Sequence, residues 1–270
     1  MATSNQGPLN SLRGHWPEYL IEAWALGTFM VSAGVLTALF EHPGSALNLA
    51  MQDATLRRAA IGLAMGLTAI GLIYSPWGQR SGAHMNPAVT LAFWRLGKVA
   101  PWDAVFYIAA QFLGGTVGVL IVAALLRSAF TAPPVHYVAT MPGSAGVWAA
   151  FAAEFAISAL LMTVVLRVSN SRFARFTGLC AGAMVALYIT VEAPVSGMSM
   201  NPARSFASAW PEGLWTHYWV YLLAPVLGMQ SAALLYSMRR NSRQAGCAKL
   251  QHSTQQRCIH CGYVPPGTQA

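Results

Sequence analysis

SGAHMNPAVT at residues 81–90 and SGMSMNPARS at residues 196–205 are two related stretches that decide how this chain folds. They share the tripeptide Asn-Pro-Ala, formed by Asn86, Pro87 and Ala88 and by Asn201, Pro202 and Ala203. Asn is a strong helix N-cap, and Pro is favoured at the first helical position, where its missing N–H removes no helical hydrogen bond. Each stretch therefore predicts the start of a helix.

The apolar runs that follow these caps are short, residues 88–94 and 203–210. About eight residues at about 1.5 Å each cover about 12 Å, less than half of the roughly 30 Å hydrocarbon core of a bilayer. Neither run can cross a membrane, but two placed end to end nearly could. One such motif fits an ordinary surface helix, whereas two copies at corresponding positions of a membrane chain indicate a pair of half-helices.

The composition identifies a membrane protein. Of the 270 residues, 55% are hydrophobic and 9% are charged, against about 25% charged in a typical soluble domain. Six apolar stretches are long enough to span a bilayer. They cover about residues 19–40, 59–77, 104–126, 147–166, 176–193 and 215–238. The predicted class is an all-α membrane protein.

A formal charge of +8 is compatible with either a nucleic-acid partner or a membrane. The placement of the basic residues along the chain distinguishes the two. With the N-terminus in the cytoplasm, most Lys and Arg residues fall in inner segments, and only four fall outside: Arg57, Arg58, Arg127 and Arg204. This bias satisfies the positive-inside rule. We therefore expect a multi-pass protein of the plasma (inner) membrane with both termini cytoplasmic, a lipid bilayer as its partner, and no nucleic acid.

That orientation places the first Asn-Pro-Ala loop on the inner side and the second on the outer side. Three spans with a half-helix after the second occur twice, over about residues 18–126 and 147–238, and an odd number of spans inverts the second copy. The predicted fold has six transmembrane helices and two re-entrant half-helices in a 3+3 inverted repeat, in a channel domain of residues 18–238. A polar segment, 1–17, precedes it, and a polar basic tail, 239–270, follows it.

Loops at membrane depth occur only where they are buried in protein or line an aqueous cavity, so two such loops predict a path through the molecule. Asn86 and Asn201 are expected to meet near the midplane, with the positive ends of two helix dipoles converging there. Such a site repels cations, including hydronium, and offers amide donors to neutral solutes. Arg204 lies one turn into the second half-helix and is expected to line the path. His84 either lines the inner vestibule or binds loop carbonyls.

Glu22 and Glu154 are lone carboxyls at matching places in the first span of each half. Either they relay protons or they accept hydrogen bonds from the loop backbone. We favour the second role, because a channel that excludes protons has no use for a relay.

The polar tail carries Cys247, His252, Cys258, His260 and Cys261. Cys-Ile-His-Cys has metal-ligand spacing, but no second ligand pair stands at a regular offset. We therefore expect a poorly ordered basic tail, with zinc binding as the alternative, and assign the chain no metal and no cofactor.

These residues resemble those of the major intrinsic proteins, the aquaporins and glycerol facilitators. The resemblance covers about Glu18 to Met238, and its most specific pieces are residues 81–90, residues 201–206 and the paired carboxyls. It implies a right-handed six-helix fold, a homotetramer with one pore per subunit, and a passive, non-enzymatic channel for water and small neutral solutes such as glycerol, urea or ammonia.

By the same resemblance, the outer constriction is formed by Met65, Ile189, Met198 and Arg204, and Tyr188 would replace Ile189 if the alignment slipped by one. Only the Arg matches the common pattern, and Ile189 stands where water-specific members usually have His. A glycerol or small-solute facilitator with little water selectivity therefore remains the alternative. A coupled secondary transporter and a membrane scaffold with a closed pore are the rivals from other classes.

Overall fold

The computed structural model describes residues 7–238, 245–253 and 255–267, which contain helices and no strand. The helices in chain order are α1 (Pro8–Glu41), α2 (Ala46–Ala50), α3 (Ala54–Tyr74), α4 (Pro76–Ser81), α5 (Pro87–Arg95), α6 (Pro101–Leu126), α7 (Ser128–Thr131), η1 (His136–Val138), α8 (Val147–Ser169), η2 (Ala174–Phe176), α9 (Thr177–Val191), α10 (Ala193–Ser196), α11 (Pro202–Glu212) and α12 (Tyr218–Met238). Six membrane-length apolar helices are present, in α1, α3, α6, α8, α9 with the turn before it, and α12. The predicted all-α membrane fold is confirmed.

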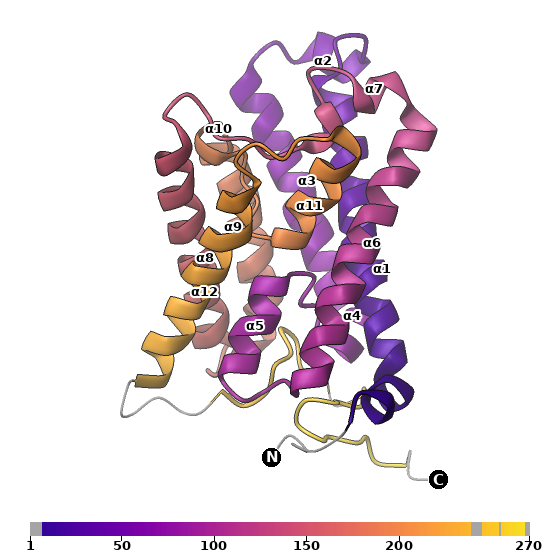
Figure 1. Ribbon diagram of the computed structural model, residues 1–270, viewed down its shortest axis with the longest axis vertical. Helices are drawn as coiled ribbons and strands as arrows, with labels where there is room; N and C mark the ends of the chain where they lie inside the picture. Colours follow the sequence, from indigo (N-terminus) through magenta and orange to yellow (C-terminus); the bar gives the residue numbers. More distant parts are fainter. Residues whose placement is uncertain (1–6, 239–244, 254, 268–270) are drawn as a thin grey trace.

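The two halves repeat the same packing (Figure 1). Helix α1 packs along α6 as α8 packs along α12, and α3 packs along α9 to join the halves. The short helices α5 and α11 both contact α6 and α12. We call the end of the bundle where α1 begins and α12 ends the terminal end, and the other the far end. Helix α5 runs from the middle of the bundle to the terminal end and α11 runs from the middle to the far end.

Helix α1 is longer than its apolar stretch. It begins at Pro8 rather than near Tyr19, so most of the polar segment 1–17 belongs to the first helix, and residues 1–6 lie outside the described part. Pro stands at the first helical position, where it is favoured. The extension is held by polar contacts: the Tyr19 hydroxyl donates to Asp103 Oδ1 at 2.7 Å, and the Ser11 carbonyl lies 3.1 Å from the same hydroxyl. Hydropathy alone cannot detect a polar helical turn of this kind.

Glycines set the distance between the paired long helices. A Cβ atom built on Gly114 would lie 2.0 Å from the Ala23 carbonyl oxygen, and one on Gly118 would lie 2.4 Å from that of Gly27. Helix α1 and helix α6 are therefore in backbone contact, the arrangement that small residues allow between membrane helices. Tight packing here fixes the position of α1, which carries Glu22.

We predict that Gly114→Ala destabilises the protein, by about 1–3 kcal/mol, because its Cβ would overlap backbone that cannot move aside. Gly71→Ala is the matched control, since a Cβ on this glycine of α3 meets nothing within 4 Å. Thermal unfolding in detergent should show a lower midpoint for Gly114→Ala and an unchanged or higher one for Gly71→Ala. Equal midpoints for the two variants would contradict the close packing of α1 on α6.

Candidate functional site

Each half-helix begins at an Asn cap, as the sequence predicts. Asn86 Oδ1 accepts a hydrogen bond from the Ala88 N–H at 2.8 Å. Asn201 Oδ1 accepts from the N–H groups of Ala203 at 3.1 Å and Arg204 at 3.2 Å. Pro87 and Pro202 occupy the first helical positions. The side-chain oxygens are thereby used for capping, and the side-chain NH₂ groups stay free to donate elsewhere.

The two Asn side chains bind each other's loops. Asn86 Nδ2 donates to the Met200 carbonyl, and Asn201 Nδ2 donates to the Met85 carbonyl, each at 2.7 Å. These reciprocal bonds place the two caps together in the middle of the bundle, where both half-helices begin (Figure 1). Because an amide NH₂ has two N–H groups, each Asn keeps one further donor. Both side chains also line the cavity described below.

The loops before the caps have an unusual backbone. Ala83 and Met85 in the first loop, and Met198 and Met200 in the second, have φ between 50° and 54°. Non-glycine residues rarely adopt this left-handed region and do so at a cost, so the surrounding structure must hold them. The two buried carboxyls supply that support.

Glu22 Oε1 and Oε2 accept hydrogen bonds from the N–H groups of His84 at 3.0 Å and Met85 at 2.7 Å. Glu154 does the same in the other half, with the N–H groups of Ser199 at 2.6 Å and Met200 at 2.7 Å. Each carboxyl also accepts a hydrogen bond from a serine hydroxyl at 2.8 Å. The donor is Ser81 for Glu22 and Ser196 for Glu154. Both Glu side chains are fully buried. They bind the loop backbone, which is the role the sequence favours over proton relay.

One cavity of about 450 Å³ connects these groups. Its lining includes Glu41 at the end of α1, Arg58 in the second turn of α3, both Asn caps, His84 of the first loop and Leu250 of the tail. The wall between them is mostly apolar, with Leu26, Phe29, Ile61, Ile73, Val89, Leu161, Val165, Ala181 and Val185. A path of this kind presents few hydrogen-bond partners except at the caps, at loop carbonyls and at charged side chains.

All four residues assigned to the constriction line this cavity: Met65, Ile189, Met198 and Arg204. Tyr188, the residue that a one-position slip would substitute, is buried and does not line it. Arg204 Nη1 is buried and has no hydrogen-bond partner within the protein. A guanidinium donor of this kind is available to a molecule in the cavity, since Arg side chains carry five N–H donors.

The C-terminal tail differs from the expected poorly ordered segment. Residues 245–253 and 255–267 fold back against the terminal end of the bundle, while 239–244, 254 and 268–270 lie outside the described residues. Ala248 and Leu250 are buried, and Leu250 lines the cavity. The His84 Nε2–H donates to the Ala248 carbonyl at 2.7 Å. Sequence reasoning missed this contact because the tail is polar and lies more than 150 positions away from the loop that it touches.

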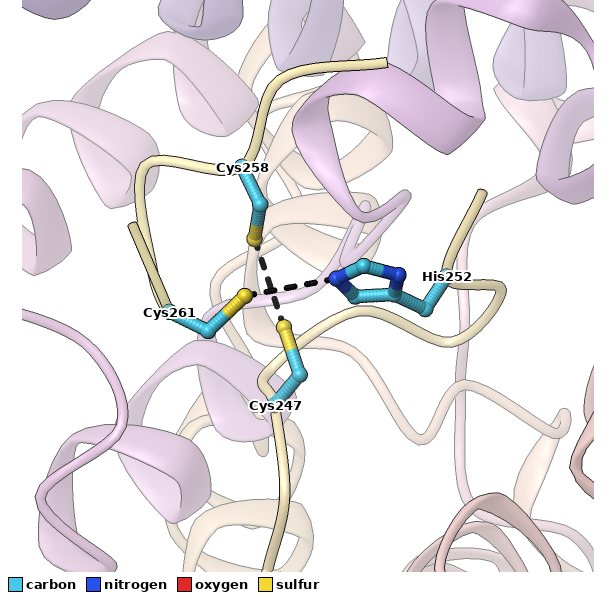
Figure 2. Close-up of side chains that lie close together, drawn as sticks. All are labelled: Cys247, His252, Cys258 and Cys261. Carbon is cyan, nitrogen blue, oxygen red and sulfur yellow. Dashed lines mark hydrogen bonds between the residues drawn. The ribbon is translucent and has the colours of Figure 1, made fainter. Parts of the chain in front are cut away.

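His260 does not join the tail's cysteines. Its Nε2–H donates to the Ser81 carbonyl at 3.1 Å, and its ring stacks on that of His84, with the centroids 5.6 Å apart. Burial, together with the neighbouring His84, lowers the pKa of His260 well below its usual value, so the ring is neutral. The histidine beside the cysteines is His252 instead (Figure 2).

Comparisons with known proteins give the same family. The family model of the major intrinsic proteins matches residues 15–236. Aquaporin NIP2-3 of Zea mays is 35% identical over 229 residues, covering 83% of this chain and 73% of the relative. Aquaporin NIP1-3 of Oryza sativa is 39% identical over 189 residues, 69% of this chain and 64% of the relative.

Among solved structures, the aquaglyceroporin from Plasmodium falciparum has the same fold, with a TM-score of 0.70 at 23% identity. The match covers 83% of this chain and 96% of that one. With the family model, the relatives and the fold in agreement, the chain belongs to the major intrinsic protein family and is a passive channel rather than an enzyme.

Proposed function

We propose that this channel conducts water and small uncharged solutes, such as glycerol, urea or ammonia, and excludes protons and ions. The observation that carries the proposal is the pair of Asn caps on one cavity, each bonded to the opposite loop. The relatives are named aquaporins and the solved structure with the same fold is an aquaglyceroporin, which supports a channel for water and small solutes.

The exclusion of charge follows from the half-helices. Each helix N-terminus carries roughly half a positive elementary charge, and two of them face the same point of a largely apolar cavity. A cation there meets repulsion in a medium that screens it poorly, whereas water offers its lone pairs to the Asn N–H groups and passes. In this proposal Asn86 and Asn201 interrupt the line of hydrogen-bonded water molecules in the cavity. Glu22 and Glu154 only hold the loops in place.

Selectivity among neutral solutes is assigned to the constriction of Met65, Ile189, Met198 and Arg204. Three of these four residues are apolar. A polyol at the constriction therefore meets one strong hydrogen-bond donor, the Arg204 guanidinium, and otherwise apolar Met and Ile side chains. Thioether side chains are flexible and fill irregular space, which narrows the passage without adding a hydrogen bond. A glycerol or small-solute facilitator with little water selectivity is the second candidate, and the Ile at position 189 favours it.

A coupled secondary transporter fits less well. Coupling needs an ionisable group at the substrate site, and the residues that meet at the middle of this cavity are Asn caps and loop carbonyls. Proteoliposomes that built a solute gradient against equilibrium would establish the transporter instead.

For the assembly we propose a homotetramer in the plasma membrane with both termini in the cytoplasm. Large apolar side chains such as Leu63, Leu113, Leu125 and Leu235 are exposed on the single chain, as lipid- or subunit-facing residues would be. The placement of basic residues supports the orientation. In it, the terminal end is cytoplasmic and His84 belongs to the inner vestibule.

We predict that vesicles carrying the protein shrink and reswell faster than protein-free vesicles in stopped-flow light scattering. Water, glycerol, urea and ammonia should be compared in one preparation, with proton flux followed by an internal pH dye. Water flux above background without proton flux is the expected outcome. Undetectable flux of all four solutes would favour a closed scaffold over a channel.

We predict that Arg204→Val raises the leak of larger solutes and of ions, because the variant removes both the charge and the bulk of the guanidinium from the constriction. The permeability ratio of glycerol to water should increase severalfold. Arg58→Val is the matched control, since Arg58 also lines the cavity but lies outside the constriction. Unchanged selectivity in Arg204→Val would mean that Arg204 is not at the narrowest point.

We predict that Ile189→His lowers glycerol flux relative to water flux, because an imidazole narrows the passage and adds a donor that suits water. The same stopped-flow assay measures both fluxes. Tyr188→His is the control, because Tyr188 does not line the cavity. If Tyr188→His changes the ratio and Ile189→His does not, the assignment of position 189 to the constriction is wrong.

We predict that Glu154→Ala destabilises the fold, because it leaves two buried backbone N–H groups without acceptors, at about 1–3 kcal/mol each. Glu154→Gln keeps one side-chain oxygen and should cost less. Thermal unfolding in detergent ranks the two variants against the wild type. A wild-type midpoint for Glu154→Ala would show that the second loop holds its shape without the carboxyl.

A further inference from the structure

The C-terminal tail crosses the terminal mouth of the cavity. The Leu250 N–H donates to the Gly82 carbonyl at 3.1 Å, and Lys249 Nζ donates to the Gln79 carbonyl at 2.7 Å. A Cβ on Gly82 would lie 3.2 Å from Lys249 Cγ, so the tail sits directly on the first loop. The tail thus forms hydrogen bonds with the loop and with the end of α4, and Leu250 lines the cavity.

Arg257 fastens the tail at a second point. Its Nε and Nη2 donate to the two carboxylate oxygens of Glu18, each at 2.9 Å, and its Nη2 also reaches the Gly14 carbonyl at 3.1 Å. Glu18 is fully buried and also receives Arg80 Nε at 3.0 Å. A two-pronged ion pair with a buried carboxylate is directional and strong. It ties the tail to α1 beside the cavity mouth.

Four side chains of the same tail segment converge on one point (Figure 2). The ligand atoms of Cys247, His252, Cys258 and Cys261 all lie within 4.8 Å of one another. Cys247 Sγ is 3.3 Å from Cys258 Sγ, and His252 Nε2 is 3.3 Å from Cys261 Sγ. Ligands about 2.0–2.3 Å from a tetrahedral zinc ion stand roughly 3.5–3.8 Å apart, close to this spacing.

The local backbone suits a metal site. Cys258 and Cys261 are three positions apart in a tight turn, closed by the Gly262 N–H bonding to the Cys258 carbonyl at 3.0 Å, with Gly262 at a φ of 76°. The Cys258 N–H in turn donates to the Tyr263 carbonyl at 2.8 Å. This turn presents two thiols on the same side, and the other two ligands come from the segment that contacts the channel loop.

A disulfide explains the cluster less well than a metal does. A disulfide would use only two of the sulfur atoms, and it gives no reason for His252 and Cys261 to converge on the same point. Three thiolates and one neutral imidazole around Zn²⁺ carry a net charge of −1. The buried ammonium of Lys249, two positions from Cys247, offers a compensating positive charge.

We propose that Cys247, His252, Cys258 and Cys261 bind one zinc ion, and that the metal folds the tail into a plug across the terminal mouth of the channel. A segment this short buries too little apolar surface to fold alone, so metal binding supplies the ordering free energy. Loss of zinc then releases Leu250 from the cavity. The metal site stands independently, and the plug rests on the proposed channel function.

Metal content tests the site. The full-length protein is purified with reductant, loaded with Zn²⁺, freed of excess ion and measured by elemental mass spectrometry, with one zinc per chain expected. Cys247→Ser and Cys261→Ser should each lower zinc to background, whereas Cys180→Ser, which removes the cysteine in α9, should retain one. A wild type without zinc, full zinc in the two ligand variants, or a Cys247–Cys258 disulfide in protein purified without reductant would overturn the site.

Water flux tests the plug. Zinc-loaded and metal-free wild type are reconstituted separately, and the metal-free form should shrink vesicles severalfold faster. Cys247→Ser should match the metal-free rate with or without zinc. Leu250→Ala should keep one zinc per chain and yet conduct severalfold faster than the zinc-loaded wild type, because it shortens the side chain in the cavity.

The outcomes separate the two proposals. Equal, measurable flux in zinc-loaded and metal-free wild type overturns the plug and leaves the channel function standing. Flux no faster than in protein-free vesicles in every form, the metal-free protein and Leu250→Ala included, overturns the channel function and the plug with it. The zinc stoichiometry is decided by the metal measurement in either case.

Discussion

The structure depends on keeping two irregular loops in the middle of the bundle with their backbone groups satisfied. Lipid offers no hydrogen-bond partner, so a loop N–H group that is buried in protein at membrane depth needs an acceptor from within the protein. Glu22 and Glu154 provide them, each with two backbone N–H groups and a serine hydroxyl. With those N–H groups held, the loop carbonyls are free to accept, and the Met85 and Met200 carbonyls receive the opposite Asn.

This arrangement links helix packing to the pore. Glu22 and Glu154 reach the loops only because α1 and α8 lie in the right place, and α1 is fixed by backbone contact with α6 at Gly114 and Gly118. Overpacking at that contact would move a carboxyl away from its loop. A residue far from the cavity can therefore affect conduction without touching a solute.

The sequence predicts much of this arrangement because it depends on local patterns. Length and hydropathy predict the six spans, the Asn-Pro pairs predict both half-helices, and matching positions identify Glu22 and Glu154. The family resemblance assigns Ile189 to the constriction; Ile189 lines the cavity, and its place at a constriction stays a prediction. The apolar stretch from about Tyr19 did not reveal that α1 begins at Pro8, because the first turns of this helix are polar and are held by contacts such as that of Tyr19 with Asp103.

The tail could not be predicted from local patterns at all. Its position follows from Arg257 meeting Glu18 and from Ala248 meeting His84, contacts that join parts of the chain more than 150 residues apart. Composition shows that the tail is polar and basic, but it does not show that the tail contacts Glu18 and His84. The spacing of the Cys-Ile-His-Cys motif was the one usable signal, but the histidine that completes the cluster is His252, outside that motif.

The two copies of the loop and half-helix have the same backbone conformation and different side chains at matching positions. Arg204 and Met198 in the second loop correspond to Val89 and Ala83 in the first, and all four line the cavity. The second copy therefore lines the cavity with larger side chains than the first. The equivalent side chains of the first copy, Ala83 and Val89, are smaller, and Leu250 of the tail adds a larger apolar residue to the lining of the same cavity.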